Sequence, residues 1–324
     1  MVEICRYADD PGRFLDLLGG SACPFADAVS FPLSARYYRA YFAGDYRGDL
    51  SFVAHEGAVV RAVVRAQAVA TTVFDNGQGA SVWLAGVAAH DVIAALDQAA
   101  RALGCHTVKV SDPAHEGRLG DLGRHLLYRR AALRSRFIAV ADLDRGDDAL
   151  RAGLRKSFRS LVNWGTRTLK LQRITAETFD AQAFESFRQF HIKISGRETR
   201  SAESWSIQAE MIRARRAELL LSYLDGHGLV GGSLLLDTGA ITTYGVGVYE
   251  RELFDKPLSH APLFMAMQHA RERGQRVFVL GDVPPAGTVT DKEFSIGQFK
   301  AGFTDTTLAA LDWTYELSAA PDHG

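Results

Sequence analysis

The sequence predicts an α+β protein built from two similar halves, each with a mixed central sheet flanked by helices. The order of amphipathic and β-branched-rich segments repeats along the 324-residue chain at an offset of about 170 residues. In each half, two apolar runs joined by a short turn precede segments that alternate between helix and strand. Three antiparallel strands followed by a β-α-β-α-β order are typical of an α+β fold with one mixed sheet.

Both halves are expected to begin with helices and to continue with a β-hairpin. The runs "LSFVAHEGAVVRAVVRAQ" and "LLLSYLDGHGLVGGSLLLD" each contain two β-rich segments around a short turn, Glu56-Gly57 in one and Asp225-Gly226 in the other. A third strand is predicted after each hairpin, in "ASVWLAGVAA" and "AITTYGVGVY".

The later elements repeat in the same order. A helix and a strand are predicted in "ALDQAARALGCHTVKVSDP" and in "AMQHARERGQRVFVLGDVP", and a further helix in "GRLGDLGRHLLY" and "DKEFSIGQFKAG". The strands "RSRFIAVADL" and "LAALDWTYEL" are expected to close the two halves. A stretch near residues 144–148 is charged and poor in apolar residues, so we expect the domain boundary there, with domains at 1–145 and 146–324. The alternative is that two unrelated α/β domains share this order by accident.

Composition narrows the possible partners. With 23% charged residues and a formal net charge of -1, the chain has no general attraction for nucleic acid or acidic membranes, so such a partner needs a local patch. The three cysteines have no CxxC or metal-site spacing, and no apolar run is long enough to span a bilayer. We therefore expect a cytoplasmic protein with no metal and no membrane span.

Three stretches of the second half carry more specific patterns: "LRKSFRSLVNWGTRTLKL", "GLVGGSLLLDTGAITTYGVGVY", and "VFVLGDV" followed by "FSIGQFKAGF". Together they resemble the GNAT N-acyltransferase fold in its tandem, Fem-like (FemAB-like) arrangement. The basic helix departs from that family, because Leu161-Val162-Asn163 stands where the family has an asparagine-isoleucine-arginine run. The resemblance implies two tandem GNAT-like domains, the first for the acceptor and structure and the second for the acyl donor and catalysis.

The resemblance also suggests a role for the FK-x-GF segment. Fem-like enzymes take an amino acid from aminoacyl-tRNA, and their Phe-Lys pair lies at the channel for the aminoacyl end of the tRNA. The matching residues here are Phe299 and Lys300. The ammonium group of Lys300 would then stabilise the negative charge that develops during acyl transfer, and Phe299 would stack on the terminal adenine. The alternative is an ordinary helix end with one solvated lysine.

Two further residues are candidates for catalysis. Asp282, after a predicted strand, can bind or deprotonate an amine nucleophile, although Asp112 at the same place in the first half also fits a structural turn. Tyr244 can donate a hydrogen bond to the acyl oxygen, or simply pack in its strand. In the first half Arg130 takes the place of Lys300 without the aromatic residue and the glycines, so we expect no chemistry there.

The donor is predicted from a missing pattern and from charge. Acyl-CoA sites of this fold usually have a glycine-rich loop at a helix start, whereas "ERELFDKPLSHAPLFMAMQ" has no glycine. Residues 151–173 carry seven cations and no acid, which suits phosphates of a tRNA or of a nucleotide-activated acceptor; a solvated helix face is the alternative. The candidate substrate-binding residues are Arg155, Lys156, Arg159, Arg197, Arg200 and His260.

These observations favour a cofactor-free N-acyltransferase that moves an aminoacyl group from aminoacyl-tRNA to an amine of a cell-envelope precursor or small metabolite. An acyl-CoA-dependent N-acetyltransferase acting on an amino sugar of a surface polysaccharide remains an alternative, because the long helical-hairpin arm of the Fem-like group has no obvious counterpart. A non-catalytic ligand-binding module is the third possibility.

Overall fold

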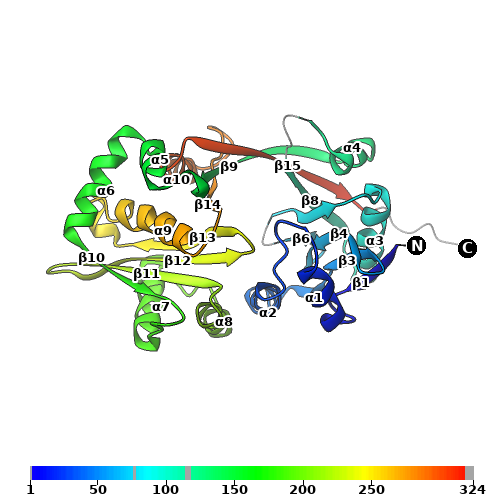
Figure 1. Ribbon diagram of the computed structural model, residues 1–324, viewed down its shortest axis with the longest axis horizontal. Helices are drawn as coiled ribbons and strands as arrows, with labels where there is room; N and C mark the ends of the chain where they lie inside the picture. Colours follow the sequence, from blue (N-terminus) through cyan, green and yellow to red (C-terminus); the bar gives the residue numbers. More distant parts are fainter. Residues whose placement is uncertain (1, 76–77, 114–117, 318–324) are drawn as a thin grey trace, which may run out of the picture. The chain divides into compact units, whose positions relative to one another are not determined.

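The computed structural model describes residues 2–75, 78–113 and 118–317, and it divides into two compact units. The first unit contains the residues up to Arg136 together with the segment that begins at Ala309, and the second unit is Phe137–Leu308. Each unit has a mixed sheet with helices packed on it, which confirms the predicted α+β class (Figure 1). Among the described residues, no helix has both the length and the apolar character needed to cross a membrane.

The first unit follows the predicted order with four additional strands. Its sheet runs in the order β1-β3-β4-β7-β8-β15, with β7 and β8 parallel and the other neighbouring pairs antiparallel. Four of these strands, β1 and the short strands β2, β5 and β6, are not predicted by the sequence pattern. Its elements are β1 (Glu3–Arg6), α1 (Pro11–Gly19), α2 (Ser30–Tyr41), β2 (Tyr46–Asp49), β3 (Phe52–Glu56), β4 (Val59–Arg65), β5 (Gln67–Val69), β6 (Thr72–Phe74), β7 (Ala80–Leu84), α3 (Ala89–Ala102), β8 (Thr107–Pro113), α4 (Asp121–Tyr128) and the start of β9 (Ala132–Asp142).

The second unit repeats the main strand path of the first, and its sheet runs β10-β11-β12-β13-β14-β9. The predicted basic helix ends at Thr168, and the residues after it form β10, which pairs with β11. The elements after β9 are α5 (Asp147–Gly153), α6 (Lys156–Thr168), β10 (Leu169–Ile174), α7 (Ala181–Ser195), α8 (Ala202–Arg213), β11 (Ala217–Leu224), β12 (Gly228–Thr238), β13 (Ile241–Tyr249), α9 (His260–Glu272), β14 (Val277–Asp282), α10 (Asp291–Ala301) and the start of β15 (Thr306–Glu316).

The two closing strands are exchanged between the halves. Strand β9, at the end of the first half, pairs antiparallel with β14 of the second unit. Strand β15, at the end of the chain, pairs with β8, and its Trp313 is fully buried in the core of the first unit. The compact units therefore differ from a simple division after residue 145, because an alternating apolar pattern specifies a strand without specifying its partner.

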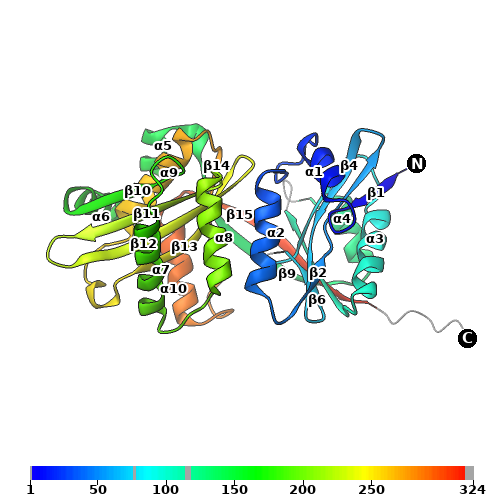
Figure 2. The same cartoon turned by 90° about the horizontal axis from the view of Figure 1, so that it is seen from below.

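Helices cover both faces of the second sheet (Figures 1 and 2). In Figure 1, α5, α6, α9 and α10 lie above the strands, and α7 and α8 lie below them. Local signals fix the helix ends: the Asp180 carboxylate accepts hydrogen bonds from two N–H groups at the start of α7, and Gly196 ends that helix in the left-handed conformation. Phe187 of α7 packs directly on Gly232 of β12, where a Cβ would overlap the ring.

Candidate functional site

The parallel strands β13 and β14 separate part-way along their length. They pair only over Ile241–Thr243 and Val277–Val279, although β13 continues to Tyr249 and β14 to Asp282. Both strands are irregular just beyond this point: the β12/β13 register shifts next to Gly245, and the β14/β9 register shifts before Gly281. Extra residues of this kind bend a strand, and such bulges often lie beside active sites. The corresponding pairs of the first unit, β4/β7 and β8/β15, keep their register.

Lys300 lies beside the bulge in β14. Helix α10 begins with a capping box between Thr290 and Glu293, and Lys300 is in its last turn. A Cβ built on Gly281 would lie 2.5 Å from the Lys300 Nζ, and the φ of Gly281 is +114°. Glycine at this position therefore provides both the backbone conformation and the space for the ammonium group.

The environment of Lys300 is not that of a solvated lysine. The side chain is partly buried, and this burial lowers the pKa of the ammonium group. The Asp282 carboxylate, at the exposed end of β14, acts in the opposite direction and partly offsets that effect. The structure thus brings two of the predicted catalytic residues, Lys300 and Asp282, together at the end of one strand.

Tyr244 belongs to a group of three hydroxyls on β12 and β13. Its hydroxyl hydrogen-bonds with those of Tyr249 and Ser233, and the Ser233 and Tyr249 oxygens are 2.8 Å apart. A Cβ on Gly247 would overlap the Tyr244 hydroxyl, so the glycine makes room for it. Burial raises the pKa of Tyr244, which keeps the phenol protonated and able to donate a hydrogen bond.

Phe299 packs in an aromatic cluster. Its ring centroid is 5.3 Å from that of His260 and 5.1 Å from that of Phe303, both in edge-on or near edge-on geometry, and Phe158 of α6 completes the group. Tyr244 and Phe299 border the same apolar core. Burial lowers the pKa of His260 to about 4, so its imidazole is neutral near pH 7, and its Nδ1 has no hydrogen-bond partner among the described residues.

The glycines on either side of the Phe-Lys pair serve packing. A Cβ on Gly297 would lie 2.6 Å from the Cδ of Pro284, and one on Gly302 would overlap the Phe158 ring. Gly302 has ordinary helical dihedrals. These two residues let α10 approach its neighbours closely. The glycine that accommodates Lys300 is Gly281. It is not among the predicted site residues, although an isolated glycine at a strand end is a bulge signal.

Arg155, the residue just before α6, is joined to α10. The Arg155 backbone N–H donates to the Gly302 carbonyl, and its guanidinium donates to the Gln298 carbonyl at 3.0 Å. Lys156 and Arg159 follow on the exposed side of α6, and the Arg159 guanidinium donates to a backbone carbonyl of α5. The start of the basic helix therefore lies next to the segment that carries Lys300.

The remaining predicted substrate-binding residues lie elsewhere. Arg200, in the loop between α7 and α8, contacts the His191 ring nitrogen at 3.2 Å and lies over the Trp205 ring. Arg197 is exposed in the same loop. The two helices that this loop joins, α7 and α8, lie on the opposite face of the sheet from α10 (Figure 1). In the first unit, Arg130 is an exposed turn residue with a φ of +59°, unlike the partly buried helical Lys300.

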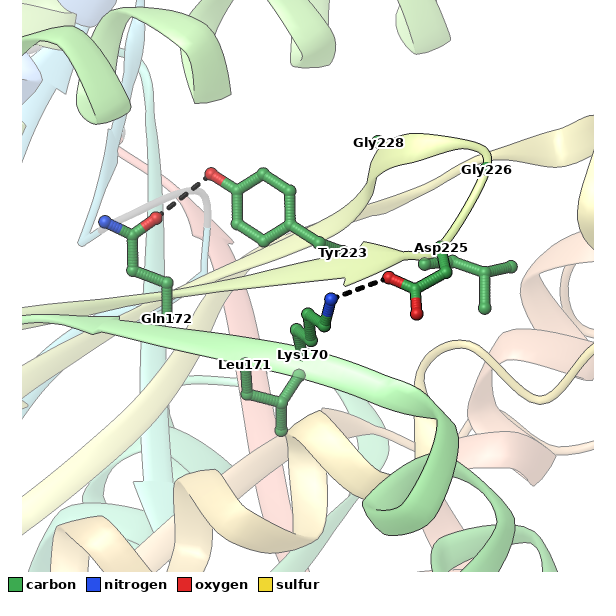
Figure 3. A pocket seen from close by; sticks show the side chains of 8 residues that line it. Lys170, Leu171, Gln172, Tyr223, Asp225, Gly226 and Gly228 are labelled. Carbon is green, nitrogen blue, oxygen red and sulfur yellow. Dashed lines mark hydrogen bonds and ion pairs between the residues drawn. The ribbon is translucent and has the colours of Figure 1, made fainter.

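A separate hollow of about 490 Å³ lies on the exposed hairpin side of the second unit. Figure 3 shows its polar walls, where the Lys170 ammonium pairs with Asp225 at 2.8 Å and the Tyr223 hydroxyl donates to Gln172. The cation and the carboxylate drawn there are paired with each other. The Lys170–Asp225 pair is largely exposed, so this hollow shares none of the features seen around Lys300.

Comparison with known proteins gives the fold. No family model matches the chain, and no curated protein matches it in sequence. Among solved structures, it is similar to FemX (TM-score 0.65, 13% identity, 96% of each chain covered). It is also similar to L-PGS from Bacillus licheniformis (TM-score 0.57, 14% identity, 94% of this chain and 91% of that one). The chain has a FemAB-like tandem GNAT fold.

A third similar structure is a tandem GNAT protein from the clavulanic acid biosynthesis pathway (TM-score 0.53, 18% identity, 99% of this chain and 100% of that one). The tandem GNAT fold agrees with the duplication predicted from the sequence. Because these identities are low, the likeness concerns the fold, and the chemistry has to be argued from the residues of this chain.

Proposed function

We propose that the protein is an N-acyltransferase whose chemistry takes place in the second unit, where β13 and β14 separate. The observation that carries this proposal is the partly buried Lys300 ammonium beside Gly281, next to the Asp282 carboxylate. The amine nitrogen of the acceptor attacks the carbonyl carbon of an activated acyl ester. The ester C–O bond then breaks, the leaving oxygen takes up a proton, and the amine loses one.

Each residue of the site has a defined part in this reaction. The Lys300 ammonium stabilises the negative charge on the carbonyl oxygen, where a fixed cation in a partly desolvated place is most effective. The Asp282 carboxylate binds the acceptor amine and takes its proton. The protonated Tyr244 hydroxyl lies on β13, the other strand at the separation, and donates to the acyl group.

We propose aminoacyl-tRNA as the donor, since the start of α9 is poorly suited to a CoA pyrophosphate. A phosphate site at a helix start needs accessible N–H groups. Here Pro262 has no N–H, and the His260 N–H donates to a carbonyl before the helix. Ala261 is fully buried, because Gly165 lets α6 pack against it: a Cβ on that glycine would lie 2.6 Å from the Ala261 Cβ.

The charges of α6 support the same donor. Arg155, Lys156, Arg159 and Arg167 are exposed, and no ion pair with a carboxylate forms at any of them within the described part of the chain. Exposed cations without a carboxylate partner, at the start of one helix and along it, suit a phosphodiester backbone. Lys170 and Arg173, farther along, pair with Asp225 and Glu218 and are less available.

The proposal is tested by thermal-shift and filter-binding measurements on the full chain with charged tRNA, uncharged tRNA and acetyl-CoA. We expect binding of charged tRNA that weakens with salt, and an Arg155→Glu/Arg159→Glu variant that loses most of it. An Arg213→Glu/Arg215→Glu variant, changed at two exposed arginines at the end of α8, provides the charge-matched control. Stabilisation by acetyl-CoA alone would contradict the tRNA donor and favour acyl-CoA-dependent transfer.

A further inference from the structure

Three hydroxyls meet beside the separation of β13 and β14. Tyr244 and Tyr249 belong to β13, and the fully buried Ser233 belongs to β12. The Ser233 and Tyr249 oxygens are 2.8 Å apart, and the Tyr244 hydroxyl hydrogen-bonds with both. In the strand order β14-β13-β12, Ser233 approaches Tyr244 from the side away from β14.

Two glycines make this arrangement possible. The Tyr244 hydroxyl occupies the place of a Cβ on Gly247, and the Tyr249 ring occupies the place of a Cβ on Gly231. Gly247 lies beyond the last residue of β13 that pairs with β14, and it is exposed. The Tyr244 hydroxyl therefore lies over the unpaired part of β13, with a hydrogen-bond partner on the side away from the separation.

The acidities of the two phenols indicate which hydroxyl donates to which. Burial raises the pKa of both Tyr244 and Tyr249. The hydrogen bonds with Tyr249 and Ser233 act against burial and lower the pKa of Tyr244, whereas the bond with Tyr244 raises the pKa of Tyr249. Such a pattern arises when Tyr249 and Ser233 donate to the Tyr244 oxygen and stabilise negative charge on it. The proton of Tyr244 is then the one left for a ligand.

We propose that Tyr249 and Ser233 are positioning residues for acyl transfer, an inference that rests on the proposed function. Their hydroxyls donate to the Tyr244 oxygen and direct the Tyr244 O–H toward the separation of β13 and β14, where it donates to the acyl group. Tyr244 keeps its proton throughout and supplies only a hydrogen bond. As negative charge grows on the acyl group, the bonds along this chain of hydroxyls strengthen together, so Tyr249 and Ser233 act on the transition state through Tyr244.

A double-mutant cycle of Tyr244→Phe and Tyr249→Phe, measured by steady-state transfer kinetics, tests the inference. Each substitution removes one hydroxyl and keeps the ring. We expect each single variant to lower kcat about tenfold with KM nearly unchanged, because a hydrogen bond to the transition state is lost or misdirected. The double variant should be no slower than Tyr244→Phe, since Tyr249 acts only through Tyr244. Ser233→Ala should behave as Tyr249→Phe does in both backgrounds.

Two further variants are matched controls. The Tyr223 hydroxyl donates to Gln172 on the exposed hairpin, so Tyr223→Phe also removes one phenol hydroxyl. The Ser222 Oγ is buried on β11 and has no hydrogen-bond partner within the described ranges, so Ser222→Ala also removes one buried serine hydroxyl. Both variants should keep the kcat of wild type.

An NMR signal follows the hydrogen bonds to Tyr244 independently of transfer. In the full chain labelled at tyrosine 13Cζ, the Tyr244 signal is assigned by its loss in Tyr244→Phe. It should move in Tyr249→Phe and in Ser233→Ala, and it should stay in place in Tyr223→Phe. A Tyr244 signal that does not move in the first two variants would overturn the inference.

The kinetic outcomes separate this inference from the proposed function. If wild type transfers acyl groups, the inference is overturned by wild-type kcat in Tyr244→Phe, Tyr249→Phe or Ser233→Ala, and also by losses that multiply in the double variant. The proposed function would survive each of these results. A wild-type protein that transfers no acyl group would overturn the proposed function, and the inference with it. If Tyr249→Phe does not fold, Ser233→Ala in the two backgrounds decides the question.

Discussion

The ammonium group of Lys300 occupies the space in which a side chain at Gly281 would begin, 2.5 Å from the position of a Cβ. The two residues belong to α10 and β14, and they meet where the register of β14 shifts. A strand bulge, a glycine with positive φ and a partly buried cation therefore coincide at one point of the second unit.

Gly281→Ala tests this relationship. The added Cβ strains a backbone with a φ of +114° and displaces the Lys300 Nζ, so we expect a loss of about 1–3 kcal/mol in the free energy of unfolding together with a large loss of transfer. Gly274→Ala is the matched control, since Gly274 also has positive φ but no atom within 4 Å of its Cβ position. Gly274→Ala should lose stability and keep the transfer activity. Equal losses of transfer in Gly274→Ala and Gly281→Ala would contradict the role of Gly281.

The pH dependence of transfer should report on Lys300. Because burial lowers its pKa from the ordinary 10.5, the ammonium is lost at a lower pH than in an exposed lysine. As the pH rises, the initial transfer rate should therefore begin to fall at a pH below 10.5. In Lys300→Arg the guanidinium stays protonated, so the residual activity should persist to higher pH. If the transfer rate fell at the same alkaline pH in wild type and in Lys300→Arg, the fall would belong to another group.

His260 should make the fold sensitive to acid. Its pKa is about 4 in the folded protein and 6.5 without burial, so the unfolded chain binds more protons between these values. The free energy of unfolding should fall as the pH drops from 6.5 to 4, and it should not depend on this group above that window. Denaturant unfolding of His260→Phe should show a smaller slope, whereas the exposed His227→Phe should follow wild type.

Because β15 pairs with β8, a destabilising mutation in β15 should affect the first unit. Trp313 is fully buried in the core of the first unit. Trp313→Ala should therefore lower the free energy of unfolding of that unit by about 3–5 kcal/mol. Hydrogen exchange should show lost protection in β7 and β8 and retained protection in β12 and β13. Loss of protection confined to the second unit would contradict the placement of β15 in the first unit.

The fold was largely predictable because apolar periodicity and turn residues act locally. The Asp225-Gly226 turn, for example, joins β11 and β12 as expected. The exchange of β9 and β15 between the halves could not be predicted, since the apolar pattern of a strand carries no information on which strand it pairs with. The first three residues of β10, Leu169 to Leu171, are predicted as the end of the basic helix because they continue the basic pattern of α6.

The candidate site was predictable only in part. Lys300 and Asp282 were selected, and the structure brings them together. The role of Gly281 depends on a side chain from another element, which no local pattern shows. The same holds for Ser233 and Tyr249, whose hydroxyls become neighbours only through pairing of β12 with β13.

The central claim is that Lys300 carries transfer and that the first unit does not. The most direct measurement is the rate at which labelled aminoacyl groups move from charged tRNA to small amine acceptors in Lys300→Met, Lys292→Met and Arg130→Met. We expect a loss of about a hundredfold or more in Lys300→Met alone, with the melting temperature close to wild type, because the cation acts on the transition state. Wild-type rates in Lys300→Met, or an equal loss in Arg130→Met, would contradict the account.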